Sequence, residues 1–261
     1  MPAKKTDNNL ITKNDKMAQN EAEQILGNPY KNGSAFKFVL LLMAIFGACY
    51  LVFIFVFQVV FKPISVIGFS MQPGINASAI GTKGDRNTDI AYYQALGSSN
   101  LSYKDIVIIN GNYTTTKHTL IKRIIATPNQ TITFKTYGLP KNDNSTQFKT
   151  YYKVSVYVND LLLAEDYIKN EEMLVKKYEL GDSFNYEFGE TYTRNLTNEG
   201  TFSYTLKEDE YFVMGDNRNN STDSRDFGPI NKKDINGKVL FTVPYGQNLA
   251  GVIWNILLGK N

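Results

Sequence analysis

Residues 211–230 read YFVMGDNRNNSTDSRDFGPI, and this stretch decides how the second half of the chain is interpreted. A short apolar strand over residues 211–214 precedes a glycine and a dense series of small polar and charged residues. This series has two interpretations. Gly, Asn, Asp and Ser are the usual residues of solvated turns. Alternatively, arginines that alternate with aspartates can pair with them and form a buried, hydrogen-bonded scaffold. The rest of the sequence must decide between the two.

The composition limits the chemistry available to this chain of 261 residues. Cys49 is the only cysteine, so no disulfide can form within the chain, and His118 is the only histidine. These residues cannot supply the soft ligands of a zinc site, and we expect neither a metal nor another cofactor. Any catalysis would therefore use hydroxyls, carboxylates, lysines or backbone groups.

The charge and the residue types describe the main domain. Residues 1–37 hold six lysines and four acids, so most of the net charge of +3 lies at the N-terminus. The nearly neutral remainder argues against a nucleic acid partner. Thr, Tyr, Val, Ile and Phe are abundant in the second half, which predicts a mainly β domain.

An apolar segment near the N-terminus predicts a membrane anchor. Residues 38–61 are apolar apart from Gln58 and lie between two lysines. About 20 such residues suffice to cross the hydrocarbon core of a bilayer. We therefore predict a polar cytoplasmic tail over residues 1–35 and one transmembrane helix over residues 36–62. The lysines on the N-terminal side predict that the N-terminus lies inside and the C-terminal domain outside.

Three alternatives fit this segment less well. A buried helix of a soluble protein is rarely apolar on all sides over such a length. A cleaved signal peptide has a shorter apolar core, closer to the N-terminus. The residues before Cys49 resemble a lipoprotein cleavage site, but the apolar run continues for twelve residues beyond that cysteine.

β-branched and alternating segments predict the strands that follow the anchor. We expect strands over residues 105–110, 118–126, 152–158, 161–167, 211–214 and 235–246, and another that begins at residue 131. Asn159 and Asp160 mark a hairpin turn. Residues 76–103 are expected to form a long loop with a helical turn near residues 92–96, and turn-forming residues interrupt the pattern over 139–150. Residues 249–258 are too short to span a bilayer, and docking on the domain is favoured over lying in the membrane interface.

Two side chains could activate a serine for attack on an amide bond, which needs a base for its proton and donors for the oxyanion. His118 is one possible base, in a Ser-His-Asp arrangement. A lysine is the other, provided that burial lowers its pKa by two units or more. Lys122 lies among Leu120, Ile121, Ile124 and Ile125 and is the lysine best placed for such burial. A surface lysine whose apolar neighbours face inward would show the same pattern.

Three ordered motifs resemble the signature boxes of bacterial type I signal peptidases. They are Ser70-Met71-Gln72-Pro73, Lys122-Arg123, and the series from Gly215-Asp216-Asn217-Arg218 through Ser221, Asp223, Ser224 and Arg225 to Gly228. The resemblance implies a membrane-anchored, β-rich catalytic domain with an inserted β-rich cap, preceded by one transmembrane helix. The expected parts are a core over residues 63–136 and 207–261, with the hairpin and cap over residues 137–206.

The resemblance also implies a role for each matched residue. Ser70 is the expected nucleophile and Lys122 the general base, while Ser221 would hydrogen-bond the lysine and fix its direction. Asp216, Asp223 and Arg225 would brace this pair. Backbone groups at Ser70 and Gly68 would form the oxyanion hole. Ser70 follows Lys62 by only eight residues, so its hydroxyl lies within about 28 Å of the membrane edge.

By this resemblance the chain removes signal peptides from exported preproteins after small-x-small sequences, on the outer side of the cytoplasmic membrane. The expected partners are preproteins and the lipid bilayer, with the secretion translocon as a further candidate. Two alternatives remain: a catalytically silent, membrane-anchored β-domain that acts as a binding module, and a Ser-Lys protease with a different client.

Some positions depart from the family pattern. Gly74-Ile75 replaces the usual Thr-Leu, Lys104 stands where a glycine precedes Asp105, and residues 126–129 read ATPN instead of Gly-Leu-Pro-Gly. These changes affect loops and the shape of the substrate pocket, and none removes a matched catalytic residue.

The two candidate bases make a first prediction. If Lys122 is the base, a His118→Ala variant retains most of its activity in a preprotein cleavage assay, because the imidazole takes no part in proton transfer. A loss of about 10⁴-fold would instead support a triad built on His118.

Overall fold

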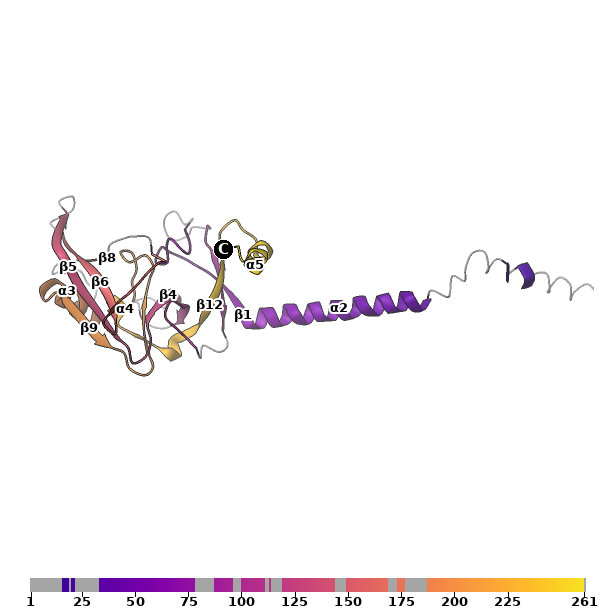
Figure 1. Cartoon of the computed structure of the whole chain (residues 1–261), viewed down its shortest axis with the longest axis horizontal. Coiled ribbons are helices and arrows are strands. Elements are labelled where there is room, and N and C mark those ends of the chain that lie inside the picture. Colours follow the sequence, from indigo (N-terminus) through magenta and orange to yellow (C-terminus); the bar gives the residue numbers. More distant parts are fainter. Residues whose placement is uncertain are drawn as a thin grey trace, which may run out of the picture. The chain divides into compact units, whose positions relative to one another are not determined.

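The computed structural model describes residues 16–18, 20–21, 33–77, 87–95, 100–110, 113, 119–143, 149–168, 173–176 and 187–260. The chain divides into two compact units, residues 1–59 and residues 60–261 (Figure 1). The first holds the apolar helix and the second holds all of the strands among the described residues. His118 lies outside the described residues.

The helix α2, Gly33–Val60, is the first unit's main element. Within it, residues Ala35–Gln58 are long and apolar enough to cross a membrane, and none of this span is buried against other parts of the protein. A helix is therefore present where residues 36–62 were predicted to form one, although it begins three residues earlier and ends two residues earlier, and its crossing of a membrane stays a prediction. Phe61 already belongs to a strand.

A seven-stranded antiparallel sheet forms the core of the second unit, in the order β1-β2-β12-β3-β4-β10-β11. Its strands are β1 (Phe61–Ser65), β2 (Ile90–Gln94), β3 (Ile106–Asn110), β4 (Thr119–Ala126), β10 (Glu210–Met214), β11 (Ile230–Asn231) and β12 (Ile235–Val243). The strands expected at residues 105–110, 118–126, 211–214 and 235–246 are all present.

Two strands of this sheet were not predicted. Strand β1 contains Pro63, whose nitrogen carries no hydrogen and cannot donate a hydrogen bond to a neighbouring strand. Accordingly, β1 lies at the edge of the sheet. Strand β2 replaces the helical turn expected near residues 92–96, so that expectation is wrong. Its pairing with both β1 and β12 is non-local, and local sequence preferences do not reveal it.

The second sheet has the order β7-β6-β5-β9, with β8 also paired to β6. Its strands are β5 (Thr131–Asp143), β6 (Lys149–Val158), β7 (Leu161–Leu162), β8 (Met173–Lys176) and β9 (Thr201–Thr205). The hairpin turn at Asn159 and Asp160 is confirmed, with both residues at positive φ. The interruption expected from residue 139 is wrong, because β5 continues to Asp143 beyond an irregularity in its pairing. The strand expected over 161–167 is only two residues long.

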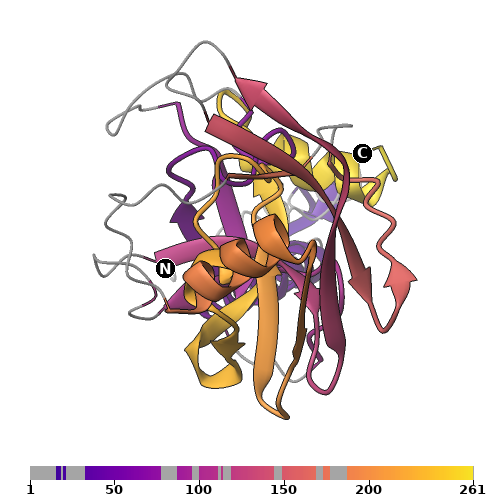
Figure 2. The same ribbon diagram turned by 90° about the vertical axis from the view of Figure 1, so that its left-hand side faces the viewer.

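The helix α3, Glu187–Asn198, covers the second sheet and was not predicted. It lies against β5, β8 and β9 and beside the short helix α4, Ser224–Phe227 (Figure 2). Its buried residues include Tyr192 and Leu196, and the Tyr192 ring meets the Phe134 ring edge-on with the centroids 5.0 Å apart. The expected cap is therefore built of strands and one helix.

Strand β10 is buried on both faces, which explains its uninterrupted apolar sequence. Phe212 and Met214 enter a core shared with Ile132 and Phe134 of the second sheet. The alternate residues Tyr211 and Val213 enter another core on the opposite face. The stretch that follows β10 is thus anchored between two apolar cores.

Two departures from the family pattern fall at special backbone positions. Lys104 has a φ of 72° and Asn129 a φ of 64°, both in the left-handed region that favours glycine. These are positions at which the family carries glycine. The chain therefore keeps the backbone turn while it changes the residue, and Asn tolerates this conformation better than Lys does.

Candidate active site

Ser70 lies in a tight turn that connects β1 to the residues before β2. The Gln72 N–H donates to the Phe69 carbonyl at 3.1 Å, and the Ile75 N–H donates to the Met71 carbonyl at 3.0 Å. Met71 and Ile75 are buried in the core of the large sheet. The turn therefore presents the serine while its neighbours anchor the backbone.

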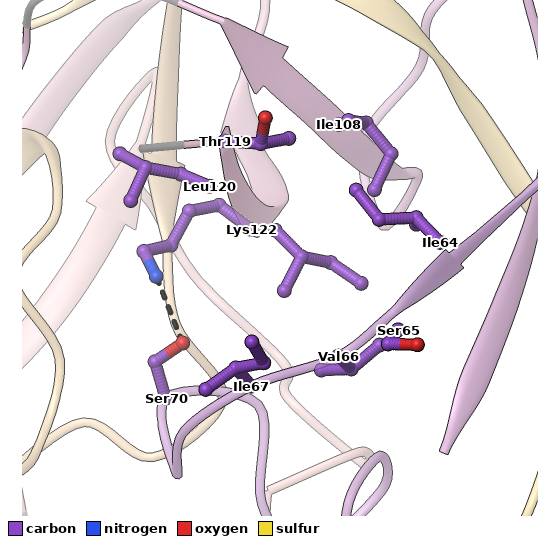
Figure 3. A pocket seen from close by; sticks show the side chains of 10 residues that line it. Ile64, Ser65, Val66, Ile67, Ser70, Ile108, Thr119, Leu120 and Lys122 are labelled. Atoms are coloured by element: carbon purple, nitrogen blue, oxygen red, sulfur yellow. Dashed lines mark hydrogen bonds between the residues drawn. The ribbon is translucent and has the colours of Figure 1, made fainter. Parts of the chain in front are cut away.

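Lys122 reaches Ser70 from strand β4. Its Nζ lies 2.8 Å from the Ser70 Oγ (Figure 3). Only 3% of Lys122 is exposed. Burial lowers the pKa of Lys122 to about 8, against an opposing contribution from the Asp223 carboxylate. The buried-lysine interpretation is therefore confirmed, and the surface alternative is wrong.

A buried carboxylate, Asp89, also holds the turn. Asp89 accepts the Asn76 N–H at 2.6 Å on one oxygen and the Tyr245 N–H at 2.9 Å on the other. The Asn76 side chain in turn donates to the Gly68 carbonyl at 2.8 Å. Gly68 has a φ of 93°, which a residue with a side chain rarely adopts. Sequence reasoning missed Asp89 and Asn76, because they lie in a segment with no recognisable motif.

The stretch 211–230 contacts the same turn directly. The Asn217 N–H donates to the Ser70 carbonyl at 3.0 Å, and its side-chain amide donates to the Phe69 carbonyl at 3.2 Å. The neighbouring Asp216 binds Arg123 in a two-point contact, with N–O distances of 2.7 and 2.6 Å. Arg123 follows Lys122 in β4, so this ion pair joins the turn after β10 to the strand that carries the lysine.

A second ion pair, between Arg225 and Asp223, lies within the same stretch. Arg225 donates to both oxygens of Asp223, at 2.8 and 2.9 Å, and both residues are buried. Burial alone would raise the pKa of Asp223, but the charge and hydrogen bonds of Arg225 hold it below its usual value. Asp223 also caps helix α4 and accepts the Gly215 N–H at 3.0 Å. The solvated-loop interpretation of residues 211–230 is therefore wrong, and the buried scaffold is confirmed.

A third ion pair connects the scaffold to the second sheet's hairpin. Arg218 is 3% exposed and donates to both oxygens of Glu165. The Tyr167 hydroxyl donates to Glu165. The Arg123 guanidinium stacks over the Tyr167 ring, with Cζ 4.1 Å from the ring centroid. Glu165 was not predicted as a site residue. Arg225 pairs with Asp223, two residues before it, whereas the partner of Arg218 lies far away in sequence. A buried arginine needs a carboxylate partner, and this requirement was the only signal for Glu165.

Ser221 does not make the expected hydrogen bond in this structure. Its Oγ is buried and has no hydrogen-bond partner among the described residues. It lies next to Gly215, where an added Cβ would come within 2.3 Å of the Ser221 Oγ and 2.4 Å of the Ser70 carbonyl oxygen. The proposed orienting role of Ser221 therefore stays a prediction, and Gly215 is a position at which no side chain fits.

An apolar cavity of about 610 Å³ opens beside the Ser70–Lys122 pair (Figure 3). Residues from three separate segments line it: Ile64, Ser65, Val66, Ile67, Ser70, Ile108, Thr119, Leu120, Ile121 and Lys122. A hydroxyl and a buried amine at hydrogen-bond distance, next to a cavity, are the arrangement that nucleophilic attack on a carbonyl requires. Among the described residues, no group of acids, cysteines and histidines could hold a metal ion.

The sequence comparisons agree with this geometry. The profile of the signal peptidase family, peptidase S26, matches residues 38–244. This chain belongs to that family. It is therefore a peptidase, and the matched segment includes Ser70, Lys122 and the whole scaffold.

Individual relatives show the extent of the similarity. Signal peptidase I P of Bacillus subtilis subsp. natto is 33% identical over 197 residues, which cover 74% of this chain and 82% of the relative. A signal peptidase I of Bacillus amyloliquefaciens is 31% identical over 168 residues, or 63% of this chain and 64% of the relative. The crystal structure of a signal peptidase I from Enterococcus faecalis V583 is 23% identical, covers 55% of this chain and 98% of that one, and has a TM-score of 0.30.

The crowding at Gly215 makes a second prediction. Gly215→Ala is expected to lower kcat/KM for peptide cleavage by about 10²-fold, because the methyl group must displace either Ser221 or the Ser70 backbone. The matched control is Gly74→Ala, whose Cβ would lie 3.7 Å from Asp216 Oδ2, an ordinary contact. Equal activity of the two variants, at equal thermal stability, would contradict the steric argument.

Proposed function

We propose that the chain is a membrane-bound serine endopeptidase that removes N-terminal signal peptides from exported preproteins. The observation that carries this proposal is the 2.8 Å contact between Ser70 Oγ and the buried Lys122 Nζ. Membership of the signal peptidase family supports the substrate class. The apolar helix α2 supports attachment to a membrane, and we propose the cytoplasmic membrane with the peptidase domain on its outer side.

In the proposed mechanism, Lys122 acts first as a base and then as an acid. The neutral amine accepts the proton of the Ser70 hydroxyl while Oγ forms a bond to the scissile carbonyl carbon. Backbone N–H groups at Ser70 and Gly68 are proposed to stabilise the oxyanion. The protonated lysine then donates its proton to the departing amine, and water hydrolyses the acyl-enzyme in a second round.

The scaffold supports this mechanism by holding the two reacting side chains in register. Asp216 orients the strand of Lys122 through Arg123, and Asn217 holds the Ser70 backbone. Asp223 and Arg225 brace the turn at Gly215 from below. We propose that Ser221, buried beside Gly215, hydrogen-bonds the amine at the stage when Ser70 carries the acyl group.

The cavity supports a substrate bound as an added strand. Strand β4 pairs with β3 along one edge and with β10 along the other. The pairing with β10 begins only at Arg123, so along that edge residues 119–122 have no partner strand among the described residues. Residues 64–67 line the opposite wall of the cavity. An extended peptide placed between them would direct alternate side chains into the same apolar wall. This matches a small-x-small sequence, whose two small residues are two positions apart.

The alternatives predict different outcomes with a purified preprotein. A silent binding module would cleave nothing, and a protease with another client would leave the preprotein intact. Incubation of the detergent-solubilised chain with one preprotein, followed by sequencing of the new N-terminus, separates these from the proposed activity. A new N-terminus directly after a small-x-small sequence is the expected result.

The dyad gives a third prediction. Ser70→Ala and Lys122→Ala are each expected to lower kcat by about 10⁴-fold or more, since each removes a reacting group, and the double variant should be no worse than either. Lys135→Ala, on an exposed part of β5, is the control and should cleave normally. Full activity of either dyad variant would exclude this mechanism.

The pH dependence gives a fourth prediction. The neutral amine is the reactive form, and the pKa of Lys122 is lowered to about 8. The value of kcat/KM should therefore rise about tenfold per pH unit below pH 8 and level off above it. A steady-state profile between pH 5.5 and 10 tests this. A maximum below about pH 6 would be incompatible with a lysine base.

A further inference from the structure

The C-terminal helix α5, Leu249–Leu257, exposes apolar side chains on the face that points away from the domain. Its inward face carries the buried Val252 and the half-buried Leu249 and Ile253. The opposite face carries Trp254 and Leu257, with 62% and 73% of each residue exposed. The helix is regular and capped, because the Asn248 side chain accepts the Gly251 N–H at 2.7 Å. It also lies after residue 244, outside the segment that matches the family.

An outward face of this kind is unusual for a helix in water. A surface helix normally carries charged or polar residues opposite its buried stripe. Here no charged residue occurs between residues 246 and 259, and the first one afterwards is the exposed Lys260. Tryptophan and leucine opposite the packed face, followed by a lysine, are typical of helices that lie in a membrane interface.

The register of the sheet relates the end of β12, six residues before α5, to β1, the first strand of the second unit. Phe61, the first residue of β1, is three residues after Gln58, the last residue of that span. Val243, at the end of β12, pairs with Ile90, which pairs with Ser65 at the end of β1. Phe61 and Ser65 are the two ends of the five-residue strand β1, and Val243 lies two strands away from Ser65. At about 3.3 Å per residue along a strand and about 4.8 Å between strands, Val243 lies about 16 Å from Phe61. Figure 1 shows β1 and α5 at the same end of the second unit.

Other exposed apolar residues surround the base of the helix. Tyr245 follows β12 and is 50% exposed, and Ile67 follows β1 and is 72% exposed. Ile90 lies between these two strands and is also exposed. Exposed apolar residues therefore occur on three neighbouring strand ends as well as on α5, and one of them, Ile67, also lines the cavity at Ser70.

Val252 packs α5 against the domain, as the sequence favoured. We infer that the exposed side of α5 also lies in the interface of the lipid bilayer, with Trp254 and Leu257 among the upper acyl chains, and forms a second membrane contact besides α2. This inference rests on the proposed membrane attachment. Its consequence is orientation: one anchor lets the domain rotate about its tether, whereas a second contact fixes which face of the domain meets the bilayer.

The single tryptophan of the chain makes the test direct, because all tryptophan fluorescence comes from α5. The full chain is reconstituted into phosphatidylcholine vesicles whose acyl chains carry bromine near the headgroup, and iodide is added in a parallel sample. The expected result is loss of most Trp254 emission with brominated lipid and little loss with iodide. Strong iodide quenching without bromine quenching would overturn the inference, since the helix would then lie in water.

Protection from both quenchers would also overturn it, because a second copy of the chain or another part of the protein would then cover Trp254.

Leu257→Asp should restore Trp254 emission in brominated vesicles and lower kcat/KM for a vesicle-embedded preprotein several-fold. Cleavage of a soluble peptide should not change. Leu161→Asp, at a position 74% exposed in the other sheet, is the matched control and should alter neither measurement. Peptide cleavage with no bromine quenching refutes the inference alone, whereas bromine quenching without any cleavage refutes only the proposed function.

Discussion

The removal of the Lys122 amine from water is the constraint on which the rest of the catalytic unit depends. An ammonium ion loses its hydration when it is buried, and the cost shifts the equilibrium towards the neutral amine. Burial on this scale needs apolar side chains on both faces of β4, and Ile124 and Ile125 supply them to two different cores. The mainly β architecture thus serves the chemistry, because only a strand inside a sheet can be covered on both sides and still present its next residue at a cavity.

The charges around Lys122 are arranged so that they do not restore its proton. Asp223 and Arg225 both lie near the amine, and their effects on its pKa have opposite signs. Because Arg225 is bound to both oxygens of Asp223, the two act on the lysine almost as a neutral pair. Asp216, which also raises the pKa of Lys122, is bound in the same way by Arg123. Asp226 raises the pKa of Lys122 as well, but burial is the largest effect and the pKa remains lowered.

The sequence predicted the pairing of Ser70 with Lys122, which the structure brings to hydrogen-bond distance, and it predicted their surroundings less well, for a physical reason. Strands β3 and β4 follow from local alternation, and the motif around Asp216 identified a scaffold. Strand β2, helix α3 and the partner of Arg218 depend on contacts between residues distant in sequence; Glu165 and Arg218 are 53 positions apart. The Ser221–Lys122 hydrogen bond is an expectation of the family resemblance alone, and Ser221 Oγ has no hydrogen-bond partner among the described residues.

The second sheet supports the structure around Ser70 and Lys122 through packing and through an ion pair. Phe134 of β5 packs against Phe212 of β10, with ring centroids 5.6 Å apart, so the core beneath the scaffold is completed by the inserted residues. Glu165 neutralises Arg218, whose Nε donates to the Gly215 carbonyl at 3.2 Å, next to the Ser70 backbone. An Arg218 without this carboxylate would be a buried, uncompensated charge, which is strongly destabilising. The geometry at Ser70 therefore depends on the docking of the hairpin as well as on the motifs that surround it.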